Sequence, residues 1–218
     1  MEQINWDRFK ELAAKLIEYK VRTSRVHINA DSWEEVIYAV LVYMEHDVVW
    51  NPASHAKGVD LEVRIGQSIL DQEVVRISAK GGKAQNQRFS MSSYRLTRYD
   101  LLEDKLEFLK DNADDLDIYL NCVREERYRD VRYYILKIPP SALVPDALLN
   151  AENWEENNQG WYIRVDVGFD ARIVKSMSHQ LWYDIPLNYP HLDRLGTIDV
   201  PRSEIGSELP EILQSLDK

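Results

Sequence analysis

Two strand-like runs joined by a polar turn stand out in the pattern of apolar and polar positions. In the run Val59–Ile65 the odd positions are apolar and the even ones charged, whereas the run Val74–Ala79 is more continuously apolar. Because successive side chains of a strand point to opposite faces, Ser78 and Lys80 are expected on one face. If the two runs pair as a hairpin, Asp60 faces Lys80 near one end of a sheet.

Helical periodicity precedes and follows these two runs. Apolar residues recurring at helical spacing predict helices at 5–20, 33–45 and 98–112. Ser32 and Glu35 have the spacing of a capping box, which makes Ser32 the expected N-cap of the second helix. Glu34 falls at the edge of the apolar stripe of that helix, where it can offer a carboxylate to an adjoining sheet.

Other strand-like runs complete the predicted fold. They lie at 48–50, 117–123, 131–138, 161–167 and 171–176. Gly81 and Gly82 are expected to end the strand that carries Lys80. The order of the elements predicts an α/β fold in which a mixed central β-sheet is flanked by helices.

Composition limits the possible classes of protein. Cys122 is the only cysteine among 218 residues, which excludes an internal disulfide and a cysteine-based zinc site. No apolar run approaches the ~18 residues of a membrane span, and the N-terminal sequence lacks the pattern of a secretory signal. We therefore expect a cytoplasmic protein without a membrane segment.

The segment Val74–Tyr99 carries lysines and arginines but no acid, in a chain whose net charge is -10. This uneven distribution predicts a directed phosphate-binding surface, although an ordinary solvated face is the alternative. Arginine can read guanine edges, and lysine mostly contacts phosphate. The candidate DNA-binding residues are Lys83, Arg88, Ser92, Arg95 and Arg98.

An aspartate and a lysine at one end of a sheet can hold a divalent cation and an attacking water together. Asp60 would be the fixed ligand, the main-chain carbonyl of Ala79 a second ligand, and Glu34 a support through a water. Lys80 would orient the attacking water or stabilise the charged transition state. The bland alternatives are a salt-bridged sheet acid, an edge-strand lysine, a solvated first-turn glutamate and, for Ser78, a strand-end hydroxyl.

The stretches Gly58-Val59-Asp60 and Ile77-Ser78-Ala79-Lys80 resemble the signature of the PD-(D/E)XK nuclease superfamily, most of all its type II restriction endonucleases. Trp33-Glu34 resembles the helix glutamate of that family. The resemblance covers about residues 33–109. It implies a restriction-endonuclease-like core, binding of Mg2+, and catalytic roles for the aspartate and the lysine.

Two positions depart from the family pattern. Val59 replaces the proline, and Ser78 stands where the second acid is expected. Glu34, Glu62 and Glu103 are the candidates to supply that acid, and Glu34 is favoured.

The resulting candidate catalytic set is Glu34, Asp60, Ser78 and Lys80. The candidate metal ligands are Asp60, Ala79 and Glu34.

The implied function is that of a Mg2+-dependent, sequence-specific double-stranded DNA endonuclease. We expect one nuclease domain over 1–218, with a helical and catalytic core at 1–145 and a strand-rich C-terminal extension at 146–218. A homodimer is expected, because one active site cuts one strand, together with a companion DNA methyltransferase that acts on the same site. The alternatives are a repair nuclease or junction resolvase on the same core, and a non-catalytic DNA-binding protein with a degraded site.

Overall fold

The computed structural model describes residues 4–50, 58–65, 73–165 and 168–209. Its α-helices are α1 (Trp6–Arg22), α2 (Ala30–Tyr43), α3 (Leu102–Asp111) and α4 (Asp146–Leu149). Short 3-10 helices lie at Pro140–Leu143, Ala151–Asn153, Lys175–Met177 and Arg202–Glu204. Its strands are β1 (Asp47–Trp50), β2 (Leu61–Ile65), β3 (Glu73–Gln85), β4 (Arg88–Arg95), β5 (Ile118–Glu126), β6 (Asp130–Ile138), β7 (Glu155–Asn157), β8 (Gly160–Val165), β9 (Phe169–Val174), β10 (Gln180–Pro186) and β11 (Asp193–Pro201).

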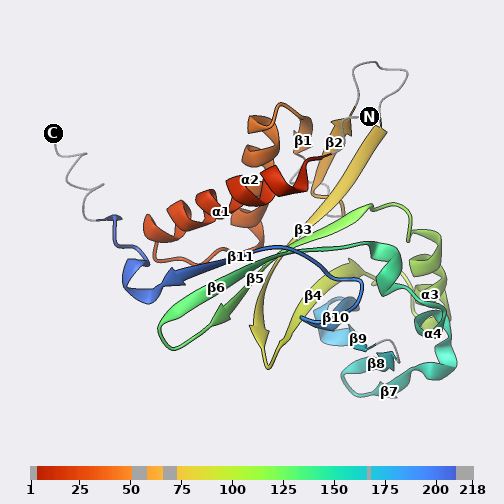
Figure 1. The fold of residues 1–218 in the computed structure, drawn as a ribbon. Helices are drawn as coiled ribbons and strands as arrows, with labels where there is room; N and C mark the ends of the chain where they lie inside the picture. Colours follow the sequence, from red (N-terminus) through yellow and green to blue (C-terminus); the bar gives the residue numbers. More distant parts are fainter. Residues whose placement is uncertain (1–3, 51–57, 66–72, 166–167, 210–218) are drawn as a thin grey trace.

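The strands form one large mixed sheet with helices on its faces (Figure 1). The strand order is β11-β6-β5-β3-β4-β10-β9-β8-β7, and β2 pairs with both β1 and β3 outside this path. β3 and β5 are parallel, whereas the other pairs found in the described residues are antiparallel. The predicted α/β class, with a mixed sheet flanked by helices, is therefore confirmed. None of the helices in the described ranges has the length and apolar character that crossing a bilayer demands.

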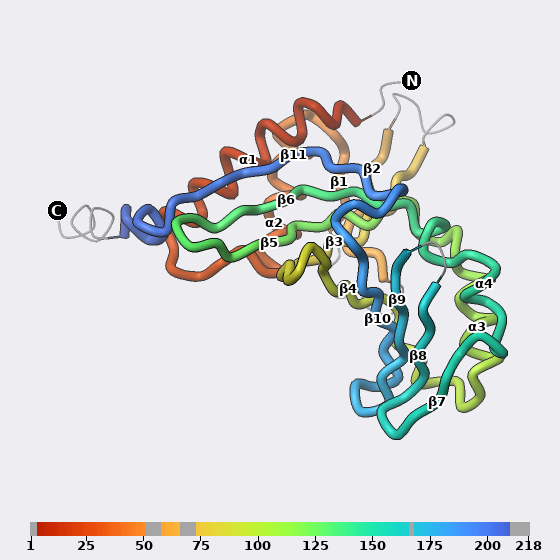
Figure 2. Tube along the Cα trace, turned by 60° about the horizontal axis from the view of Figure 1, so that its bottom comes forward, coloured from red at the N-terminus to blue at the C-terminus, as the bar shows by residue number. Residues whose placement is uncertain are grey.

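Two apolar cores lie on opposite faces of the long strands. Helices α1 and α2 cover one face, and the strands β7 to β10 lie with α3 and α4 on the other side (Figures 1 and 2). The first core includes Phe9 and Trp33 from the helices, and the second includes Phe89 and Tyr183 from β4 and β10. Alternate residues of β3 and β5 therefore face different cores, as strand geometry requires.

Among the described strands, only β3 pairs with two different strands along one of its edges. On one side it pairs with β5 over Ile77–Lys83. On the other side it pairs with β2 over Glu73–Ile77 and with β4 only at Ala84 and Gln85. Within the described residues, this second edge consequently has no strand partner from Ser78 to Lys83.

Several sequence-based predictions are confirmed. The strands expected at 48–50, 117–123 and 131–138 correspond to β1, β5 and β6, and the first helix corresponds to α1. The runs at 161–167 and 171–176 correspond to the antiparallel pair β8 and β9, apart from residues 166–167, which lie outside the described residues.

The prediction that Ser32 caps the second helix is wrong. α2 begins earlier, with Asn29 as its N-cap, and Ser32 is the third residue of the helix. The Asn29 side chain accepts from the Ser32 backbone N–H at 2.9 Å, and the Ser32 hydroxyl oxygen accepts from the Asn29 N–H at 2.9 Å. Glu35 is therefore not needed for a capping box, and it pairs with the Lys20 amine at 2.6 Å.

The prediction that Gly81 and Gly82 end a strand is also wrong, because β3 continues to Gln85. The chain turns at Asn86 and Gln87, whose φ angles are 51° and 60°. Two consecutive left-handed residues match the twist of a tight hairpin, so β3 leads directly into β4. The helix expected at 98–112 begins only at Leu102.

Gly81 lets the N-terminus of α2 rest directly on β3. A Cβ atom at this position would lie 2.6 Å from the Ala30 nitrogen and 2.8 Å from the Asn29 carbonyl carbon. Both are backbone atoms, so a side chain here would displace the start of the helix. The same contact fixes where Glu34, on the next turn of α2, stands over the sheet.

We expect Gly81→Ala to lower the free energy of unfolding by roughly 1–3 kcal/mol, because it forces backbone atoms apart. Gly82→Ala is the matched control, since its Cβ would meet the Ser90 carbonyl oxygen at 3.4 Å and a Val123 methyl at 3.8 Å. Urea unfolding of both variants measures the difference. Equal losses in the two variants would show that α2 is not held by this contact.

Candidate active site

Asp60 lies directly before β2, opposite Ser78 on β3. Its backbone N–H donates to the Ile77 carbonyl at 2.9 Å, which extends the β2–β3 ladder by one step. β2 pairing stops there, so the Asp60 side chain enters the open stretch of the β3 edge. The residue is 6% exposed.

The structure brings Asp60, Ser78 and Lys80 together around one carboxylate oxygen. Asp60 Oδ2 accepts from the Ala79 backbone N–H at 2.7 Å and from the Ser78 hydroxyl at 3.0 Å. The Lys80 ammonium lies 3.5 Å from the same oxygen. Aspartate and lysine therefore share one side of the sheet, close enough for both to contact a single phosphate group.

The Ala79 carbonyl is directed to the same open edge. In an extended strand the N–H and C=O of one residue point to the same side. The Ala79 N–H reaches Asp60 on that side, so the carbonyl oxygen faces the space that β2 and β4 leave open.

Glu34 stands next to this cluster on α2. It is 8% exposed, and the indole N–H of Trp50 donates to its carboxylate at 3.4 Å. Burial raises the pKa of Glu34 above its ordinary value, and the negative charge of Asp60 raises it further. The Trp50 hydrogen bond and the charge of Lys80 act in the opposite direction. Two buried carboxylates therefore lie close enough for their charges to interact.

These residues fit a hard divalent cation by chemical type. Carboxylate and main-chain oxygens are the ligands that Mg2+ prefers, and Asp60, Glu34 and the Ala79 carbonyl are groups of this type. However, within the described part of the chain no group of three histidine, cysteine, aspartate or glutamate side chains is placed to hold a metal. Any cation here would depend on Asp60, Glu34 and the Ala79 carbonyl.

Ser78 is fully buried and donates its hydroxyl proton to Asp60. In this arrangement it fixes the aspartate instead of adding a negative ligand. Of the acids that could replace the missing one, Glu62 lies opposite Arg76 in the β2–β3 pair. Glu103 lines a groove between α3 and α4. Glu34 is the acid whose charge interacts with that of Asp60.

The candidate DNA-binding residues do not form one basic surface. The Lys83 amine lies 3.0 Å from Glu126. The Arg88 guanidinium lies 2.9 Å from Asp170 and 3.3 Å from Asp184. Acids distant in the sequence therefore neutralise these cations in the folded chain.

Arg95 and Arg98 are exposed where β4 ends and the chain turns toward α3. No ion pair of either residue is found in the described ranges. Ser92 is half-buried on β4 and lies opposite Trp182 of β10. The two arginines are therefore the members of the candidate set whose charge is most available to a polyanion.

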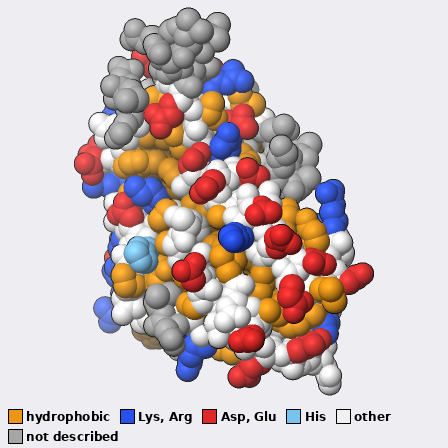
Figure 3. All heavy atoms as spheres, turned by 90° about the vertical axis from the view of Figure 1, so that its right-hand side faces the viewer, with side chains coloured by type: hydrophobic (Ala, Val, Ile, Leu, Met, Phe, Trp, Pro, Cys, Tyr) orange, Lys and Arg blue, Asp and Glu red, His pale blue; other side chains and the backbone are white. Residues whose placement is uncertain are grey.

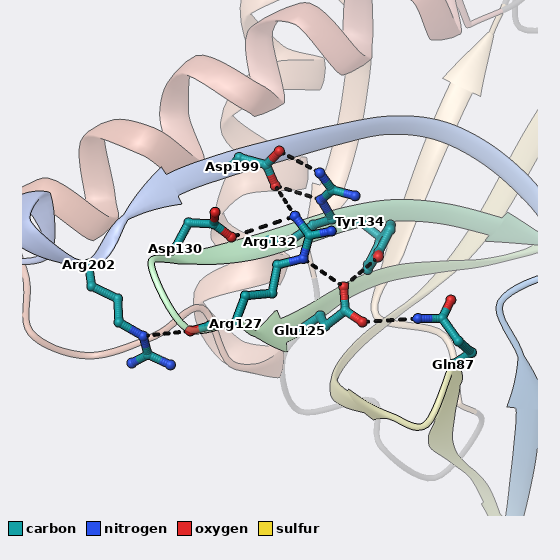
Figure 4. Close-up of polar contacts among 8 residues, drawn as sticks. All are labelled: Gln87, Glu125, Arg127, Asp130, Arg132, Tyr134, Asp199 and Arg202. Atoms are coloured by element: carbon teal, nitrogen blue, oxygen red, sulfur yellow. Dashed lines mark hydrogen bonds and ion pairs between the residues drawn. The ribbon is translucent and has the colours of Figure 1, made fainter.

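Two other surfaces carry clustered charge. Acidic side chains are spread over the face formed by α3 and α4 (Figure 3), where Glu103, Glu107 and Asp146 line a groove. On β6, in the β5–β6 turn and just after β11, arginines contact acids and the main chain (Figure 4). Arg132 there donates twice to Asp199, at 2.6 Å each.

Sequence reasoning did not single out Trp50 or Asn121. Trp50 contacts Glu34, and it also lies with its ring 5.4 Å from that of Tyr38. Asn121 is a buried amide on β5, in register with Lys80. The sequence alone could have identified Asn121, because it is the one strongly polar residue in the apolar run 118–123.

No family model, no curated protein and no solved structure matches this chain.

The environment of Glu34 makes stability depend on pH. Because its pKa is raised in the folded chain, ionised Glu34 destabilises the fold above that pKa, and the effect vanishes below the ordinary value of 4.5. We expect Glu34→Gln to raise Tm at pH 8 without metal and to leave it unchanged at pH 4. Thermal unfolding with a chelator present at both pH values measures this.

Glu35→Gln is the control for this prediction, since Glu35 is exposed on the same helix turn and pairs with Lys20. It is expected to give no gain at pH 8. A lower Tm for Glu34→Gln at pH 8 would contradict the electrostatic description of the site.

Proposed function

We propose that this chain is a Mg2+-dependent endonuclease of the PD-(D/E)XK type, which hydrolyses phosphodiester bonds in double-stranded DNA. The observation that carries the proposal is the placement of Lys80 3.5 Å from Asp60 at an open strand edge, with Glu34 close enough to interact electrostatically with both. Sequence-specific cleavage by a type II restriction enzyme, with a restriction-endonuclease-like core, is the form that the motif residues favour.

Each residue has a role in this proposal. Asp60, the Ala79 carbonyl and Glu34 would hold Mg2+, which lowers the pKa of a bound water and neutralises phosphoryl charge. Lys80 donates to the attacking water or to the phosphoryl oxygens. Ser78 and the Ala79 N–H keep the Asp60 carboxylate in one orientation, which fixes its position relative to Lys80.

The substrate is expected to approach away from the acidic face. The groove between α3 and α4 is lined by two glutamates and an aspartate against one lysine, so its net charge repels phosphates. Arg95 and Arg98 supply exposed positive charge after β4. A symmetric homodimer would present two such sites to the two strands of a palindromic sequence, and a companion methyltransferase would protect that sequence in the host.

A non-catalytic DNA-binding protein is the second candidate. It is favoured by the serine at position 78, and by Asp60 Oδ2, which already accepts bonds from Ala79 and Ser78. A repair nuclease or junction resolvase would use the same residues on a different DNA shape. Branched DNA and plain duplex, incubated in parallel, separate these alternatives.

The decisive measurement is digestion of a mixed-sequence plasmid with Mg2+, followed by sequencing of the ends. We expect discrete fragments with one shared end sequence, and a fall in the cleavage rate of roughly 100- to 1,000-fold in Lys80→Ala, because a transition-state donor is lost.

Lys15→Ala is the control for the plasmid digestion, since Lys15 is exposed on α1. An inactive wild-type protein across plasmid, duplex and branched substrates would favour the non-catalytic alternative.

Binding measurements test which cations meet phosphate. We expect Arg95→Ala to weaken duplex binding and to reduce the slope of log K against log salt by about 0.9, the loss of one phosphate contact. Lys83→Ala should change the slope far less, because its amine already pairs with Glu126 at 3.0 Å. Fluorescence anisotropy in a chelator, over a range of KCl, measures both variants. The opposite ranking would place the duplex against the Lys83 face.

A further inference from the structure

Asn121 is a buried polar residue on β5, directly beside Lys80. The two residues are partners in the parallel β3–β5 register. Side chains of registered residues in neighbouring strands lie on the same face of the sheet. The neighbours of Asn121 on that face, Tyr119 and Val123, belong to the apolar core between the long strands and β4.

The amide of Asn121 is poorly satisfied. The residue is 1% exposed, and its side-chain oxygen is buried with no hydrogen-bond partner among the described residues. Its amide nitrogen makes only a long contact, 3.4 Å, with the Tyr119 carbonyl. A buried acceptor left without a donor destabilises a fold, so an apolar residue of the same size would suit this position better.

The strand register makes Lys80 the candidate donor. Its ammonium has three N–H groups and is held by Asp60 at 3.5 Å, longer than a hydrogen bond. A cation bound to the Asp60 carboxylate would repel the ammonium and take over the oxygen that holds it. Lys80 would then need a second acceptor, and the Asn121 oxygen lies on the adjacent strand at the same level of the sheet.

We propose that Asn121 is a positioning residue that accepts a hydrogen bond from Lys80 when the Asp60 carboxylate is engaged by a cation. The catalytic meaning of this contact rests on the proposed function. The contact itself is inferred from the β3–β5 register and from the burial of Asn121. A neutral acceptor holds the ammonium in place without adding negative charge next to a phosphate.

The geometric part is tested by thermal unfolding in a chelator. Asn121→Leu in the wild-type background should raise Tm by roughly 2–4 °C, because an unpaired polar atom is removed. In the Asp60→Ala background the same substitution should lower Tm, because Lys80 has lost Asp60 and has moved to Asn121. In a third background, Asp60→Ala combined with Lys80→Met, Asn121→Leu should again raise Tm. Equal shifts of Tm in all three backgrounds would overturn the proposal.

A second measurement covers the case in which Asp60→Ala fails to fold. The wild-type protein and the Asn121→Leu variant are compared with and without Mg2+. Mg2+ should abolish the gain in Tm of Asn121→Leu, because the cation frees Lys80. Cys122→Val is the control, since Cys122 is the next residue of β5, is 1% exposed and belongs to the core on the other face. A gain in Tm that Mg2+ leaves unchanged would count against the transfer of Lys80.

Cleavage kinetics separate a positioning role from a structural one. Asn121→Leu should lower kcat roughly 10- to 100-fold and leave KM unchanged, whereas Cys122→Val should change neither. If the wild-type protein cleaves no DNA, the nuclease proposal fails while the Tm comparison still decides whether Lys80 moves to Asn121. An active Asn121→Leu variant with wild-type kcat would overturn the positioning role.

Discussion

The Asp60 carboxylate is the interaction on which the candidate site depends. Strand β2 stops pairing with β3 at Ile77, and the next contacts across that edge come from the Asp60 side chain to Ser78, Ala79 and Lys80. A side chain thus replaces a strand as the partner of β3. The Asp60 side chain satisfies the Ala79 N–H, and the Ala79 carbonyl points to the same edge, where no strand of the described residues pairs with it. The candidate site and the end of the β2–β3 ladder are consequently one structural feature.

Helix α2 completes the site because of a glycine. Its N-terminus rests on Gly81 at a distance that no side chain would permit, and this close approach brings the next helical turn over the open edge. Glu34 is buried there beside Asp60, with its pKa raised. Burial is the main cause of that shift, and the charge of Asp60 adds to it. Ionised Glu34 therefore carries an energetic cost that a glutamine would avoid.

The first two helices, the strands β1, β2, β5, β6, β8 and β9, the α/β class and the approach of Asp60 to Lys80 could be predicted because they follow from local rules. The strands β4, β7, β10 and β11 are not among the predicted elements. Alternation in β2 and β3 fixes the faces of their side chains, and helical spacing places Glu34 at the edge of its stripe. The extent of β3 could not be predicted, because Gly81 and Gly82 normally interrupt strands and here serve close backbone contact. The predicted start of α2 is too late because Asn29 and Ser32 form their own capping box.

The ion pairs show most clearly what the sequence alone does not reveal, namely which distant residues meet in the fold. The segment 74–99 contains no acid, yet its Lys83 and Arg88 meet carboxylates from β5, β9 and β10. Those partners are brought in by strand order, which no local pattern encodes. Asn121 illustrates the same limit from the other side, because its polarity is visible in the sequence and its register with Lys80 is not. Chemistry that depends on a neighbouring strand requires the topology, and here the topology places an unpaired amide oxygen beside the lysine of the candidate site.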